Sequence, residues 1–170
     1  MFQKILVPTD FSKHSQHLLE CIPELSSQKD VVLLHVIQGT PLSRAWDPAS
    51  EVEKANEMIE KQKLYLQSLR FNVKTRVETI MEGDIYKIIQ KVADEENATL
   101  IAMGARGKGM VSGLLLGSVS KNVLLYGQTN LLLMRYKVLE GENLGRFCRC
   151  LLYTSPSPRD RTRSRMPSSA

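Results

Sequence analysis

A strand that runs directly into a glycine-rich loop and then into a helix, over residues 99–119, constrains the fold of this chain more than any other segment. The apolar run from Leu100 to Met103 predicts a buried strand, and Gly104 ends it. Further glycines follow at positions 107, 109, 113 and 117. We expect Ser118 to be the N-cap of the next helix, which an apolar pattern extends through Leu125.

This arrangement suits a bound phosphate group. Glycines let backbone N–H groups approach an anion closely, and the start of a helix adds unpaired donors and a favourable dipole. The loop is not a P-loop, because no Gly-Lys-Ser/Thr triplet follows a strand. Nor is it the dinucleotide-binding fingerprint, because Ser112 stands where that pattern requires a glycine. A glycine loop by itself is also often just a tight connection.

Strand-like and helix-like segments alternate along the whole chain. We expect strands at 5–7, 31–37, 73–80, 100–103 and 131–136, and helices near 18–25, at 50–69, near 85–92 and after 118. Residues 31–37 are almost continuously apolar, as in strands that a parallel sheet buries on both faces. Residues 73–80 alternate, which favours a half-exposed edge strand. The pattern predicts a three-layer α/β/α domain with a five-stranded parallel sheet.

The spacing Gly104-x2-Gly107-x9-Gly117-Ser118 resembles the nucleotide-binding pattern of the universal stress protein family, in its ATP-binding branch. The resemblance covers residues 2–137 and implies a Rossmann-like, adenine nucleotide alpha hydrolase-like fold with strand order 3-2-1-4-5. It also implies a homodimer formed through the last strand, from Leu131 to Tyr136, whose apolar edge otherwise invites aggregation. Family members often have a proline before that strand, where this chain has Asn130.

With this strand order, the winding of the sheet reverses between the first and fourth strands, which is where doubly wound sheets bind ligands. Pro8, Thr9 and Asp10 follow the first strand, and Met103 and Gly104 end the fourth. Two signals far apart in the sequence therefore converge on one predicted crevice.

Each part of the crevice can be given a chemical role that agrees with the family resemblance. Asp10 suits a ribose hydroxyl, or a metal such as Mg²⁺ through water, and the backbone of Val36 can pair with an adenine edge. Arg106 and Lys108 can add positive charge near the phosphates. Backbone N–H groups that can bind the phosphates lie at Gly104, Gly107, Gly117, Ser118 and Val119.

These residues favour an ATP-binding universal stress protein that acts as a dimeric regulatory module in a stress response. Nothing resembles a catalytic base or an arginine finger, so we expect no enzyme, and at most slow, incidental ATP hydrolysis. The alternatives are a slow ATPase or phosphoryl-transfer enzyme, with Asp10 holding magnesium, and a nucleotide-independent interaction scaffold. Asp10 or Ser12 can also be the N-cap of the helix that follows the first strand. His14 and His17 lack a third ligand, so we expect no protein-held metal.

The net charge of +5 does not indicate nucleic-acid binding, because most of it comes from four arginines in residues 150–170. That segment has no periodicity, and Cys150 to Ser155 and Arg163 to Ala170 back-translate to the two ends of a sequencing-library adapter. We therefore expect a nucleotide-binding domain at 1–137, a linker or extension at 138–149, and a non-native tail at 150–170.

The remaining composition is that of an ordinary globular domain, with 42% hydrophobic and 24% charged residues. No apolar run approaches the roughly 18–20 residues of a membrane span. The amino terminus shows no export signal, and three irregularly spaced cysteines do not form a disulfide framework. We expect a cytoplasmic protein that contacts neither membrane nor nucleic acid.

Overall fold

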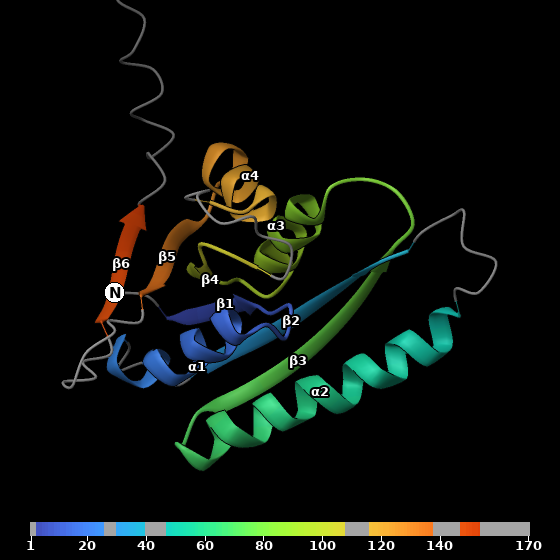
Figure 1. Cartoon of the computed structure of the whole chain (residues 1–170), viewed down its shortest axis with the longest axis horizontal. Helices are drawn as coiled ribbons and strands as arrows, with labels where there is room; N and C mark the ends of the chain where they lie inside the picture. Colours follow the sequence, from blue (N-terminus) through green and yellow to red (C-terminus); the bar gives the residue numbers. More distant parts are fainter. Residues whose placement is uncertain (1–2, 26–29, 40–46, 108–115, 138–146, 154–170) are drawn as a thin grey trace, which may run out of the picture.

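The structure, a computed structural model, describes residues 3–25, 30–39, 47–107, 116–137 and 147–153. Helices and strands alternate as the sequence pattern predicts (Figure 1). In chain order they are β1 (Lys4–Pro8), α1 (Lys13–Leu25), β2 (Asp30–Gln38), α2 (Pro48–Ser68), β3 (Asn72–Ile80), α3 (Ile85–Glu95), β4 (Leu100–Gly104), α4 (Ser118–Tyr126), β5 (Asn130–Lys137) and β6 (Phe147–Tyr153).

The strands form one sheet in the order β3-β2-β1-β4-β5-β6. The first five pair in parallel throughout, which confirms the predicted five-stranded parallel sheet with strand order 3-2-1-4-5. β1 lies at the centre, where Leu6 is opposite Val32 of β2 on one side and Ile101 of β4 on the other. The winding direction therefore reverses at the carboxyl ends of β1 and β4.

A sixth strand extends the sheet beyond the predicted five. β6 runs antiparallel along the outer edge of β5, with Met134 opposite Cys150. Residues 147–149 fall in the predicted linker or extension and residues 150–153 in the predicted non-native tail, so no strand was expected here. Their backbone instead gains its hydrogen-bond partners from an edge that would otherwise be open.

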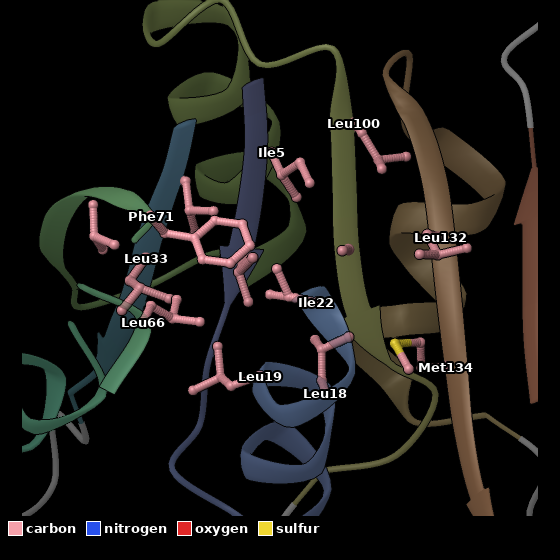
Figure 2. Close-up of a cluster of buried hydrophobic side chains, with 14 of the residues drawn as sticks. Ile5, Leu18, Leu19, Ile22, Leu33, Leu66, Phe71, Leu100, Leu132 and Met134 are labelled. Carbon is pink, nitrogen blue, oxygen red and sulfur yellow. The ribbon is translucent and has the colours of Figure 1, made fainter. Parts of the chain in front are cut away.

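Two hydrophobic clusters cover the two faces of the sheet. Because successive side chains of a strand point to opposite faces, Ile5 and Val7 of β1 pack beneath α1 and α2, whereas Leu6 packs beneath α3 and α4. Figure 1 shows these two helix layers on opposite sides of the sheet, and Figure 2 shows the first cluster, in which Leu18, Leu19 and Ile22 of α1 meet the strands. This double burial explains why residues 31–37 read as a nearly continuous apolar run.

The amino-terminal ends of β1, β4 and β5 are linked through two polar side chains. The Oγ1 of Thr99 accepts the backbone N–H of Gln3 at 2.7 Å, and the Nδ2 of Asn130 donates to the carbonyl of Thr99 at 2.9 Å. A proline in place of Asn130 could not donate this hydrogen bond. Asn130 thus joins β5 to β4 by a side-chain contact.

Candidate functional site

A cavity of about 420 Å³ opens at the carboxyl ends of β1 and β4, where the sheet reverses its winding. Every predicted site residue that the structure describes lines this cavity, namely Pro8, Thr9, Asp10, Val36, Met103, Gly104, Arg106, Gly107, Gly117, Ser118 and Val119. The predicted convergence of the two distant segments is therefore present in the fold. Lys108 lies outside the residues that the structure describes.

The turn after β1 forms one wall. The N–H of Thr9 donates to the carbonyl of Leu34 at the end of β2, at 2.8 Å, and Thr9 is only 5% exposed. The Oδ1 of Asp10 accepts the N–H of Ser12 at 3.0 Å. Ser12, not Asp10, precedes the first residue of α1, and its Oγ accepts the N–H of Ser15 at 3.3 Å. Of the two predicted N-cap candidates, Ser12 therefore fills the role and Asp10 does not.

The second carboxylate oxygen of Asp10 lies against the glycine loop. A Cβ atom added to Gly107 would come within 2.6 Å of the Oδ2 of Asp10, a distance that real Cβ contacts do not reach. A side chain at position 107 would therefore displace this oxygen. Glycine here lets two segments from opposite halves of the chain touch across the cavity.

The opposite wall is built on the carbonyl group of Ala105. This oxygen accepts the N–H of Gly117 at 2.8 Å and the Oγ of Ser120 at 2.9 Å, while the N–H of Ala105 donates to Met134 of β5 at 2.8 Å. Ser120 is 3% exposed and also donates to the carbonyl of Gly117 at 3.0 Å. Sequence reasoning missed Ser120, although a serine three residues after the last loop glycine signals such a contact to the helix start.

Helix α4 begins one residue earlier than predicted. The N-cap is Gly117, with extended backbone (φ −72°, ψ 161°), and Ser118 is the first helical residue and makes no side-chain capping hydrogen bond. The Oγ of Ser120 donates to the carbonyls of Gly117 and Ala105 at the start of the helix, and Ser118 lines the cavity. The N–H groups of Ser118 and Val119 belong to the first turn, which has no intrahelical acceptors for them.

The guanidinium of Arg106 supplies the charge that fits an anion. Its Nε atom is buried and, among the residues that the structure describes, has no hydrogen-bond partner. Burying an unpaired cationic donor is costly unless an acceptor approaches it. The same cavity presents the first turn of α4, so two independent features favour a negatively charged ligand.

Apart from Ser15 and His35, the rest of the lining is apolar and comes mostly from the α3 side of the sheet. Sequence reasoning missed these residues because each also belongs to, or packs against, the hydrophobic cluster under α3 and α4, so a core role explains them equally well. They are Leu34, Ile85, Ile89 and Leu116. An apolar part beside a polar, anion-binding part suits a flat ring joined to a phosphate chain.

A protein-only metal site is not present in the described part of the chain, where no three His, Cys, Asp or Glu residues gather closely enough to hold an ion. His17 instead contacts Glu20, with 3.2 Å between its Nδ1 and the Oε2. Among the described helices, none is long and apolar enough to cross a membrane.

Comparison with known proteins identifies relatives across this fold. The family model described as the universal stress protein family matches residues 1–135. A universal stress protein of Methanothermobacter thermautotrophicus is 33% identical, over 79% of this chain and 97% of its own. The solved structure of MJ0577 of Methanocaldococcus jannaschii is 30% identical and has a TM-score of 0.65, over 78% of this chain and 95% of its own. A universal stress protein of Archaeoglobus fulgidus in complex with dAMP shares the fold, at 18% identity and a TM-score of 0.59, over 78% of this chain and 98% of its own.

Proposed function

Because the chain belongs to the universal stress protein family, we propose that its cavity binds ATP and that the protein is a dimeric regulatory module of a stress response. One observation carries the proposal. The turn after β1, the end of β4 and the start of α4 come from distant parts of the sequence, and they line one cavity with phosphate-binding chemistry at one end and apolar walls at the other.

The geometry supports a specific orientation of the nucleotide. Backbone N–H groups at Gly107, Ser118 and Val119 and the guanidinium of Arg106, whose Nε is buried, would hold the phosphates. Asp10 would accept from a ribose hydroxyl, and the apolar wall beside Val36 would hold the adenine ring. Mg²⁺, when it accompanies ATP, would be held by the phosphates, with Asp10 as a ligand through water.

Regulation is the proposed role, and catalysis is not. Bound ATP would favour one conformation or one partner-binding state of the protein, as any ligand with differential affinity does. We propose that hydrolysis, where it occurs, is slow and incidental. Because three irregularly spaced cysteines form no disulfide framework, the cytoplasm is the proposed compartment.

A thermal-shift titration of the full chain with ATP, AMP and GTP, each with and without Mg²⁺, tests the proposal. ATP at a hundredfold excess over its Kd should add about 2.7 kcal/mol to the free energy of unfolding. For a domain of this size, that raises the Tm by about 5–11 °C. AMP is a necessary comparison, because the fold neighbour from Archaeoglobus fulgidus is in complex with the adenine nucleotide dAMP.

Two variants locate the binding in the cavity. Asp10→Ala removes the proposed ribose acceptor, and Gly117→Ala adds a methyl group whose nearest neighbour, the Oγ of Ser120, lies at an ordinary 3.5 Å, so the fold should tolerate it. Both should lose the ATP shift, whereas Asp30→Ala, at the amino-terminal end of β2 and far from the cavity, should keep it. No shift with any nucleotide would reject ATP binding and favour a nucleotide-independent scaffold. ATP turnover abolished by Asp10→Asn would favour an ATPase instead.

A further inference from the structure

The peptide group that joins Thr9 to Asp10 is held by a side chain from another strand. The Nδ1 of His35 lies 2.7 Å from the carbonyl oxygen of Thr9. A carbonyl oxygen can only accept a hydrogen bond, so Nδ1 must carry the proton and donate it. The N–H of Thr9 donates in turn to the carbonyl of Leu34, at 2.8 Å. Leu34 and His35, which are consecutive residues of β2, therefore bond the N–H and the carbonyl of Thr9.

The His35 ring itself lies on the other face of the sheet from the apolar wall of the cavity. Its neighbours Leu34 and Val36 belong to, or pack against, the cluster under α3 and α4, and side chains alternate along a strand. The ring packs instead against Phe11, with 4.3 Å between ring centroids, and Phe11 packs against the cluster under α1 and α2. His35 is one of the residues that line the cavity, and the hydrogen bond of its ring connects it to the Thr9 peptide.

That peptide sets the direction of the Asp10 side chain. The chain immediately after it is constrained, because Phe11 has a left-handed backbone (φ 59°), which is unfavourable for a non-glycine residue. The N–H of Phe11 is bonded to the Oγ1 of Thr9 at 3.2 Å, and the Oδ1 of Asp10 to the N–H of Ser12 at 3.0 Å. With the Thr9 carbonyl fixed as well, the Oδ2 of Asp10 is directed at Gly107 across the cavity.

We propose that His35 is a positioning residue that holds Asp10 in the orientation needed to bind the ribose hydroxyls of a nucleotide. This inference rests on the proposed function and adds a determinant of ligand specificity to it. It requires that loss of the His35 N–H weakens binding of ribonucleotides selectively, because phosphate and adenine contacts do not depend on Asp10.

The test compares Kd values of the full chain for ATP and for 2′,3′-dideoxy-ATP, measured by isothermal titration calorimetry. His35→Phe keeps an aromatic ring of similar size against Phe11 and removes the donor, whereas His35→Asn keeps an N–H close to the position of Nδ1. We expect His35→Phe to weaken ATP binding about tenfold, as loss of one positioned hydrogen bond does, and to leave dideoxy-ATP binding within about twofold. His35→Asn should restore most of the preference for ATP.

A structural role alone gives a different result. If His35→Phe weakens both nucleotides equally, or neither, the positioning role is rejected while ATP binding stands. If the wild-type chain does not prefer ATP over dideoxy-ATP, the proposed ribose contact of Asp10 is itself wrong, and the inference fails with it. A second measurement needs no folded variant: long-range ¹H–¹⁵N NMR correlations of the wild-type imidazole must show the proton on Nδ1. An unprotonated Nδ1 would overturn the proposal.

Discussion

At the scale of single residues, the candidate site depends on Gly107, whose missing side chain leaves room for the carboxylate of Asp10. Asp10 and Gly107 come from opposite halves of the chain, and the missing side chain of Gly107 is what lets the Oδ2 of Asp10 reach that position. The contact is with the carboxylate at the end of the Asp10 side chain and not with the backbone. A methyl group added at Gly107 should therefore move the Asp10 carboxylate and leave the fold intact.

This geometry predicts the effect of Gly107→Ala. The added Cβ would displace the Asp10 carboxylate, so ATP affinity should fall about as far as in Asp10→Ala, whereas the free energy of unfolding should change by less than about 1 kcal/mol. In the Asp10→Ala background, Gly107→Ala should have little further effect on affinity, since the two residues act through one contact. Titration calorimetry and urea unfolding of the four proteins measure both quantities. Strictly additive losses of affinity would contradict the shared contact.

At the scale of elements, an ion-pair cluster fastens the end of α3 to the edge strand β3. Glu96, which follows α3 and is 6% exposed, accepts from the Nζ of Lys74 at 2.6 Å and from the Nη1 of Arg76 at 3.1 Å. Arg76 also contacts Glu78 and, at 3.0 Å, Glu95. The hydrogen bond from Lys74, together with that from Arg76, lowers the pKa of Glu96 against the opposing effect of burial. Hydrogen bonds to Glu78, Glu96 and Glu95 raise the pKa of the Arg76 guanidinium.

The cluster predicts a pH-dependent stability. Because the pKa of Glu96 is lower in the folded chain than in the unfolded chain, its contribution is fully present above about pH 5 and is lost as the pH falls through the folded value. Glu96→Gln should therefore cost about 1–3 kcal/mol at pH 7, and the difference from wild type should shrink toward zero below about pH 4. Urea unfolding at several pH values measures this difference.

A matched control separates this cluster from ordinary surface charge. Glu51 pairs with Lys54 at 3.1 Å on α2, but both side chains are well exposed, so Glu51→Gln should change the free energy of unfolding by less than about 1 kcal/mol at any pH. A Glu96→Gln effect as small as that of Glu51→Gln, or independent of pH, would contradict the role given to the buried carboxylate.

At the scale of the whole molecule, the open question is what covers the outer edge of β5. In this structure β6 of the same chain pairs with it, from Leu131 opposite Tyr153 to Lys137 opposite Phe147. The homodimer proposed through residues 131–136 uses the same edge. A second copy and β6 therefore cannot pair with β5 at the same time.

This competition predicts that the oligomeric state depends on β6. Because residues 150–153 of the predicted non-native tail complete β6, the chain with this tail should be monomeric at micromolar concentration. Residues 1–146, which lack β6, should form the proposed dimer, because an uncovered apolar edge strand favours pairing. Size-exclusion chromatography with light scattering gives the mass of each. Circular dichroism of the shorter chain checks that it is folded. A folded, monomeric 1–146 chain would reject the β5 dimer.

The sequence by itself determined the local elements, the parallel sheet and the residues of the cavity. Continuous apolar strands, helical periodicity and the glycine spacing are local properties of the sequence. The strand order 3-2-1-4-5 followed from the resemblance of the glycine spacing to that of the universal stress protein family. Tertiary structure alone decided the rest, because those features depend on contacts between distant segments. Ser120 rather than Ser118 anchors the start of α4, since the Ala105 carbonyl lies within its reach. The hydrogen bond of His35 to Thr9 and the pairing of β6 with β5 also join distant segments, and the residue pattern of each segment alone does not predict either contact.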